Sequence, residues 1–439
     1  MARLVLAALI AALLAAAPAG AAERLITLEG APAAGPARYD RVFVQQIGPR
    51  RPKRVLVLVP GFFGGAGGIS PVARDIAARV PGLAVWVVDR RENAFEDTSV
   101  FERHDAQAAF DYYMNFRYKT VRGADVPYVG RWGLRVALGD LRRVIRRARA
   151  GGRRQVILGG HSLGGSTTVA YAAWDFNGRA GHEDIDGMVL IDGGLLGSFR
   201  GAGRRRARSI LAEIKEGRVF DDLLGLGLPE INGIFTEVAA QLAYERPDEP
   251  SALQGYALLP DDFKAPFPVT NEAALGFAFD ASTSPEGFEL IRIRAGGLAA
   301  SGDPRPWQDG ELTPIRRFAK AWAAEKPNAT QWYFSKRLRL DVDAMSALRV
   351  TPTTRLLGLR PLHARTIDVP LYAYGTDLTG GRVESGARSL VRLSDIPRST
   401  VVADPRASHL DPVSAAPARN RFLKTVVPFL KRLGRSGSR

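Results

Sequence analysis

One serine stands in a setting that could make its hydroxyl a nucleophile. Ser162 is the central residue of Gly160-His161-Ser162-Leu163-Gly164, which fits the pattern G-x-S-x-G. In that pattern the serine occupies a sharp strand-to-helix turn, and the glycines are needed because a Cβ there would collide with the turn. A serine hydroxyl is a weak nucleophile and needs an adjacent base. The motif therefore predicts acyl transfer, by attack on an ester, a thioester or an amide.

The surrounding residues predict the elements that such a turn requires. An apolar run, Gln155 to Leu158, is typical of a buried strand, and Ser166 to Trp174 predicts a helix rich in small residues. Similar patterns recur along the chain and alternate between strand and helix, which indicates a parallel sheet covered by helices. The other predicted strands are 41–47, 54–59, 83–88, 188–191, 370–374 and 400–403, and the other predicted helices are 101–117, 132–150 and 417–433.

A glycine-rich turn between a strand and a helix can also bind phosphate. The sequence at 159–165 lacks the Lys-Ser/Thr pair of a Walker loop, and its glycines do not fit G-x-G-x-x-G. We therefore favour the catalytic interpretation.

The motif Gly-His-Ser-Leu-Gly after a buried strand, within this alternation, resembles the α/β-hydrolase superfamily. The resemblance covers about 40–197 and 366–433. It implies an α/β fold with an eight-stranded, mostly parallel sheet flanked by helices. It also implies a triad in the chain order Ser, Asp or Glu, His, without a metal or an organic cofactor.

The chain order of that family assigns the base and the acid. The sequence has five histidines, and His409 lies in the loop after the last predicted strand, where the family has its base; His363 is the main alternative. Asp377, which follows the strand 370–374, is the predicted acid, and Asp192, after the strand 188–191, is the alternative. Asp404 and Asp411 flank the histidine closely, so we expect them to shape its loop.

An oxyanion hole needs two fixed backbone amides. The first should be the N–H of Leu163, directly after the nucleophile. The second should come from the loop after the strand 54–59, so we predict Phe62, with Phe63 as its neighbour. This loop begins Pro60-Gly61, where the family often has His-Gly, and the departure matters little because the backbone donates.

A long segment separates the two parts of the predicted sheet. We expect a first part of the core at 22–197, a mainly helical cap at 198–365, a second part of the core at 366–433 and a basic tail at 434–439. Ligands of open α/β sheets bind at the carboxyl ends of the strands, which this cap should cover. Its aromatic residues either line an apolar pocket or form the core of the cap, and the second is the more common.

Composition limits the chemistry further. Among 439 residues there is no cysteine, which excludes disulfides, thiolate metal sites and a cysteine nucleophile. The net charge is +16, which predicts at most a weak attraction to anionic surfaces, since no nucleic-acid module is recognisable. The charged loop that begins at Asp89 is typical of an ion-paired surface, although Arg90 or Glu96 could face a substrate.

The first residues resemble an export signal. Arg3 precedes an apolar run from Leu4 to Ala17, and a small-x-small site ends at Ala21. We predict a signal peptide over 1–21, cut before Ala22, and hence a secreted or periplasmic protein; an uncut anchor is the alternative. No later stretch of the sequence reaches the length of a membrane span.

These observations together predict a secreted serine hydrolase, similar to lipases and esterases, that cleaves carboxylic esters through Ser162, His409 and Asp377. Its partner would be a small-molecule or lipid-like ester. A secreted aminopeptidase-type enzyme and an acyltransferase are the enzymatic alternatives. A non-catalytic binding protein of the same fold is less favoured, because all three residue types of a triad are present in order.

Overall fold

The computed structural model describes residues 22–323 and 326–436. The predicted signal segment 1–21 lies outside the described residues. No helix in the described ranges is long and apolar enough to cross a bilayer.

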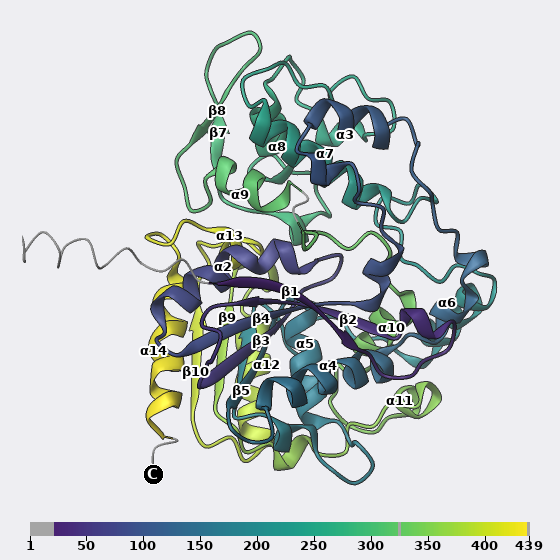
Figure 1. Cartoon of the computed structure of the whole chain (residues 1–439), viewed down its shortest axis with the longest axis vertical. Helices are drawn as coiled ribbons and strands as arrows, with labels where there is room; N and C mark the ends of the chain where they lie inside the picture. Colours follow the sequence, from purple (N-terminus) through teal and green to yellow (C-terminus); the bar gives the residue numbers. More distant parts are fainter. Residues whose placement is uncertain (1–21, 324–325, 437–439) are drawn as a thin grey trace, which may run out of the picture.

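An eight-stranded sheet forms the centre of the lower part of the molecule (Figure 1). Its strand order is β1-β2-β4-β3-β5-β6-β9-β10. β2 runs antiparallel to β1 and β4, and all the other neighbours are parallel. The eight-stranded, mostly parallel sheet predicted from the sequence is therefore confirmed. The strands are β1 (Glu23–Glu29), β2 (Arg41–Ile47), β3 (Arg54–Val59), β4 (Leu83–Asp89), β5 (Gln155–His161), β6 (Gly187–Ile191), β9 (Leu371–Gly375) and β10 (Ser399–Ala403).

Helices cover both faces of the sheet, which explains why its inner strands β3, β4, β5, β6 and β9 are mostly apolar and buried. In β3, Val55 and Val57 pack into the core that contains α4 (Leu134–Arg149), α5 (Leu163–Ala173) and α12 (Arg382–Leu393). Leu56 and Leu58 of the same strand pack into the opposite core. That second core contains α2 (Ala66–Arg79), α13 (Asp411–Ser414) and α14 (Arg421–Ser436).

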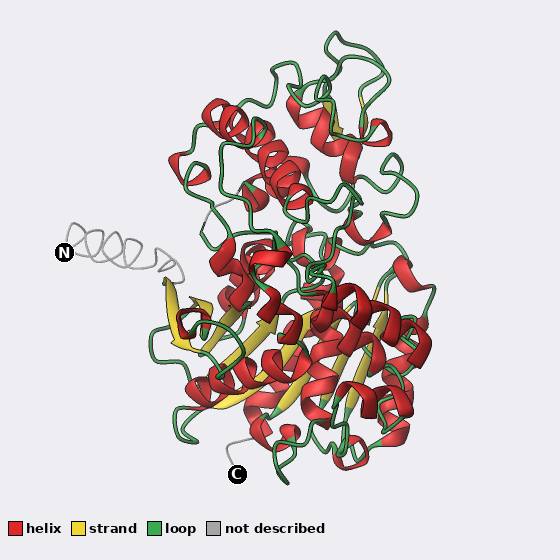
Figure 2. Ribbon diagram, turned by 90° about the vertical axis from the view of Figure 1, so that its right-hand side faces the viewer, coloured by secondary structure: helices red, strands yellow, loops and turns green. Residues whose placement is uncertain are grey.

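The segment between β6 and β9 contains most of the remaining helices and divides into two parts (Figures 1 and 2). One part lies over the sheet as an upper lobe, joined by α3 (Ala106–Tyr113), which packs on α7. The upper lobe further comprises α7 (Ile231–Glu245), α8 (Asn271–Phe279), β7 (Gly296–Leu298), β8 (Trp307–Asp309) and α9 (Ile315–Trp322). The predicted cap, 198–365, therefore leaves out α3, which packs in the upper lobe. It also includes helices that pack beside the sheet and do not belong to that lobe.

The other part packs beside the sheet. α10 (Lys336–Ala344) contacts α4 and α5, and it also contacts α6 (Arg204–Lys215) and α11 (Pro352–Leu357). Short 3₁₀ turns connect the elements at Ala37–Tyr39, Arg91–Phe95, Phe101–Arg103, Gly123–Asp125, Pro127–Arg131, Gly181–Asp184, Asp261–Phe263, Glu289–Ile291, Ala364–Thr366 and Asp377–Thr379.

Candidate active site

Ser162 sits at the predicted turn between a strand and a helix. β5 ends at His161 and α5 begins at Leu163. Ser162 has φ 56° and ψ −124°, and a non-glycine residue keeps such a positive φ only when its surroundings enforce it. A Cβ on Gly160 would collide with the backbone of Gly164, and one on Gly164 would collide with the carbonyl of Val59. The glycines of the motif therefore permit the close packing that holds the serine in this turn.

His409 lies against Asp192, in a fully buried pair. Its Nδ1 is 2.6 Å from Oδ2 of Asp192, and the side chains of the two residues are 2% and 0% exposed. Because the carboxylate accepts, Nδ1–H is the donor, and Nε2 remains as the basic nitrogen of the ring. Thr376 also donates to Asp192, through its backbone N–H at 2.9 Å and through its hydroxyl. Burial opposes ionisation of Asp192, but the hydrogen bonds from His409 and Thr376 outweigh it and lower its pKa.

The prediction of Asp377 as the partner of the histidine is wrong, and Asp192, the alternative acid, occupies that place. Asp377 accepts hydrogen bonds from Arg294 at 2.9 Å and from the Ser408 hydroxyl at 3.1 Å. The physical reason is register: Tyr374 of β9 lies opposite Ile191 of β6, so Thr376 faces Asp192 and Asp377 has already turned away into a 3₁₀ turn.

Other acids shape the histidine loop, as expected. Asp411 accepts from the Ser408 N–H at 2.7 Å and from the Arg294 N–H at 3.0 Å. Asp404 accepts from the Tyr374 hydroxyl at 2.6 Å. Asp411 thus fixes the backbone beside His409, Asp404 ties the start of this loop to the side chain of Tyr374 in β9, and neither carboxylate contacts the ring of His409.

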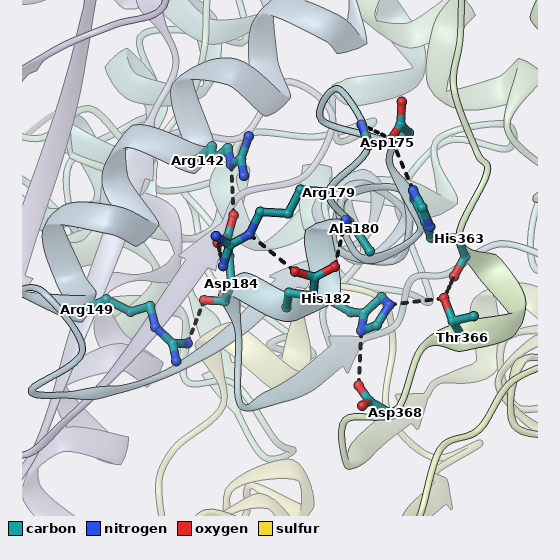
Figure 3. A network of polar contacts seen from close by, with 12 residues as sticks. Arg142, Arg149, Asp175, Arg179, Ala180, His182, Asp184, His363, Thr366 and Asp368 are labelled. Atoms are coloured by element: carbon teal, nitrogen blue, oxygen red, sulfur yellow. Dashed lines mark hydrogen bonds and ion pairs between the residues drawn. The ribbon is translucent and has the colours of Figure 1, made fainter.

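The histidine proposed as the alternative base belongs to a separate polar network (Figure 3). Nε2 of His363 lies 3.1 Å from Oδ1 of Asp175. His182 bridges Asp368, at 3.0 Å, and the hydroxyl of Thr366, at 3.2 Å. Both histidines therefore link the loop after α5 to the segment that leads into β9, and neither lines the cavity described below.

His161, the residue before the serine, braces the catalytic loop. Its Nε2–H donates to the backbone carbonyl of His409 at 2.9 Å, and the two rings are 4.4 Å apart. Burial and the neighbouring His409 lower the pKa of His161 to about 3, so the ring stays neutral at physiological pH. The contact of His161 is therefore with the loop that carries His409.

The predicted oxyanion donors lie beside Ser162. The N–H of Leu163 opens α5, and no acceptor in the described part of the chain takes up this N–H or that of Phe62. Gly61 packs so closely that a Cβ on it would lie 2.9 Å from Cβ of Ser162. Phe63, the next residue but one, has a left-handed φ of 53°. The loop 60–64 thus turns sharply beside the serine, and the N–H groups of Phe62 and Leu163 have no acceptor among the described residues, as an oxyanion hole requires.

A large apolar cavity joins these groups to the upper lobe. Ser162, His409, Phe62 and Phe63 line it together with side chains of α7 and α8, and it holds about 1350 Å³ of space, part of it open to solvent. Among its described lining residues, Lys264 is the one with a full charge, and it pairs with Asp261 at 2.8 Å. The apolar side chains that line it include Leu223, Phe235, Leu253, Phe279, Phe288, Ile291, Trp322 and Leu410.

The aromatic residues of the inserted segment are mostly core residues. Trp332, Tyr333 and Phe334 are almost completely buried, whereas Trp322 is both buried and part of the cavity wall. Among the described residues, no group of three or more His, Asp or Glu side chains is placed to hold a metal ion.

The comparisons with known proteins concern the fold. No protein-family model and no curated protein matches the chain. A candidate lipase from Sulfolobus solfataricus is a structural match with 14% identity, 93% of this chain and 94% of that chain covered, and a TM-score of 0.51. An esterase from Thermogutta terrifontis, solved with malate bound, matches with 12% identity, 93% and 99% coverage and a TM-score of 0.44. At such identities the first likeness shows a shared fold, and the second adds no argument of its own.

Proposed function

We propose that this chain, a member of the α/β-hydrolase superfamily, is a serine hydrolase that cleaves carboxylic esters through an acyl-enzyme. One observation carries the proposal: the buried hydrogen bond from His409 Nδ1 to Asp192, beside a serine in the strained turn between β5 and α5. This bond fixes the tautomer that leaves Nε2 free to accept a proton.

The groups act in two half-reactions. Ser162 Oγ attacks the ester carbonyl while His409 Nε2 takes its proton, and Asp192 stabilises the imidazolium. The N–H groups of Leu163 and Phe62 donate to the oxyanion of the tetrahedral intermediate. The carbon–oxygen bond to the alcohol then breaks and the alcohol leaves with the proton from His409. Water, deprotonated by His409, attacks the acyl-enzyme and releases the acid and Ser162.

The cavity supports an ester with an apolar acyl chain. Each methylene that leaves water for such a wall contributes about 0.8 kcal/mol, and apolar side chains form most of the lining. An aminopeptidase must bind a charged amine, for which a carboxylate is the usual partner. No Asp or Glu is among the described lining residues, so esters are favoured over peptides.

Acyl transfer to an acceptor other than water would use the same groups. Export of the protein is part of the proposal and rests on the sequence of residues 1–21.

Turnover of p-nitrophenyl esters tests the function. The wild-type protein should hydrolyse p-nitrophenyl octanoate, and Ser162→Ala should abolish the turnover. Ser198→Ala is the matched control, since Ser198 is also buried but donates to the Leu195 carbonyl and does not line the cavity. Retained turnover in Ser162→Ala, or none in the folded wild type, would contradict the proposal.

A further inference from the structure

Arg90 donates hydrogen bonds to several backbone carbonyls of the loop that contains the Phe62 amide. It directly follows β4, and its Nη2 donates to the carbonyls of Pro60 at 2.6 Å and Gly61 at 3.2 Å. Its Nη1 donates to the carbonyl of Gly64 at 3.2 Å. One guanidinium group thus binds three carbonyls within a stretch of five residues.

Two residues of the inserted segment also contact Arg90. Arg90 Nη1 also donates to Oε1 of Gln331 at 2.8 Å, and the guanidinium lies 5.1 Å from the ring centre of Phe334. Gln331 is fully buried, and its backbone N–H donates to the carbonyl of Phe63 at 2.9 Å. Four carbonyls of the loop 60–64 are therefore held by Arg90 or by its partner Gln331.

The direction of these carbonyls determines where the amides point. A trans peptide is planar, and its C=O and N–H point in opposite directions. Because the carbonyl of Gly61 points to Arg90, the N–H of Phe62, in the same peptide unit, points away from Arg90. Gly61 packs directly against Ser162, and Phe62 lines the cavity with that serine.

We propose that Arg90 is a positioning residue: it fixes the peptide between Gly61 and Phe62 so that the Phe62 N–H faces the oxyanion formed at Ser162. The proposal rests on the proposed function and goes further, since it assigns a catalytic consequence to a side chain that contacts neither substrate nor triad. A hydrogen bond to the carbonyl of a peptide also polarises its N–H, which strengthens the donor.

The chemistry of the side chain fits this task. A guanidinium offers five N–H donors in a rigid plane, whereas a lysine offers a single charged centre on a flexible stem. Burial lowers the pKa of Arg90 to about 10, with Glu92 and Asp89 opposing the shift. The group therefore remains charged at neutral pH and can hold all of its acceptors.

Arg339 provides a matched control. Its guanidinium lies 5.2 Å from the ring centre of Phe62, so it contacts the same residue, but its Nη1 donates to Asp221 at 3.1 Å. Arg90→Lys and Arg339→Lys make the same chemical change at two arginines that both lie next to the loop. Only the first removes hydrogen bonds from the loop carbonyls.

The experiment measures kcat and KM for p-nitrophenyl octanoate, the affinity for an alkylboronic acid, and thermal stability. The tetrahedral adduct of the boronic acid on Ser162 places an oxygen where the oxyanion forms. Since loss of one oxyanion donor costs about 10²–10³ in kcat, Arg90→Met should lose about 10- to 100-fold in kcat with KM within about twofold. Its boronate affinity should fall in parallel. Arg90→Lys should lose less, and Arg339→Lys should keep kcat within about twofold.

The outcomes separate the two proposals. If the wild type turns over esters and Arg90→Met keeps its kcat, or loses only KM, the role of Arg90 is overturned while the function stands. If the folded wild type neither turns over esters nor binds the boronate, both proposals are overturned. If Arg90→Met does not fold, the comparison of Arg90→Lys with Arg339→Lys decides: equal kcat overturns the role, and a loss confined to Arg90→Lys supports it.

Discussion

The imidazole of His409 and the carboxylate of Asp192 are 2.6 Å apart, although 216 residues separate them in the chain. The sheet brings them together. Asp192 directly follows β6, which pairs with β5, and the N–H of Ser162 donates to the carbonyl of Ile191 at 2.8 Å. Asp192 and Ser162 thus directly follow two adjacent strands, and the loop after β10 brings His409 to Asp192 and to the cavity that Ser162 also lines.

Exchanging the two candidate acids for amides tests which one serves His409. Asp192→Asn should keep the fold and lower kcat by about 10³–10⁴, because the amide no longer stabilises the productive tautomer or the imidazolium. Asp377→Asn should keep kcat within about threefold of the wild type, since Asp377 contacts Arg294 and Ser408 and not His409. Steady-state kinetics on both variants checks this, and a larger loss in Asp377→Asn than in Asp192→Asn would refute the assignment.

A bulky side chain in the cavity should shorten the range of accepted acyl chains. Ala239 of α7 lines the cavity, and Ala239→Trp would fill part of it. We expect kcat/KM for p-nitrophenyl dodecanoate to fall at least about tenfold, because several methylenes worth about 0.8 kcal/mol each lose their site. The acetate ester should change by less than about twofold and is the internal control. Equal losses for both esters would argue against the cavity as the acyl site.

The free energy of unfolding should fall as the pH rises, because Glu237 is a buried carboxyl group. It is fully buried and accepts from the Trp332 indole at 3.0 Å and from the Thr330 hydroxyl. Burial raises its pKa from 4.5 to about 8. Over that window the folded protein keeps a proton that the unfolded chain releases, so the free energy of unfolding falls with increasing pH.

Glu237→Gln removes this titration and should flatten the decline. Urea unfolding between about pH 5 and pH 8 measures it. Glu249→Gln is the control, because Glu249 is exposed and pairs with Arg246 on the surface. An unchanged slope in Glu237→Gln would show that the proton is not held there. The neighbouring Glu96, whose pKa burial also raises, should preserve part of the wild-type slope.

Local patterns predicted much of the fold. The apolar runs of β3, β4, β5 and β6 are strands because they are buried on both faces, and the predicted nucleophile turn lies where the motif places it. α2 escaped prediction because it contains Pro71 and two glycines in its first turn, which are typical of loops. The predicted helix 101–117 is shorter in the structure, where only α3 is α-helical. It begins after Asp105, because the side chain of Asp105 caps its N-terminus.

The errors at the site arose from tertiary structure. The family's chain order favoured Asp377, whereas the register of β6 against β9 puts Asp192 next to His409. One local signal did point to Asp192: it directly follows the strand that comes after the nucleophile strand in the chain, and consecutive strands commonly pair. The contact between Arg90 and Gln331 joins positions 241 residues apart, so no local pattern could reveal that the charged loop after β4 supports the oxyanion loop.

Covalent labelling of the folded protein tests the central claim most directly. A fluorophosphonate reacts readily with a serine that is activated as a nucleophile, and intact-protein and peptide mass spectrometry locate the adduct. The account predicts a single adduct on Ser162, none in Ser162→Ala, and much slower labelling in Asp192→Asn than in Asp377→Asn. An adduct on another residue, or none on the folded wild-type protein, would contradict it.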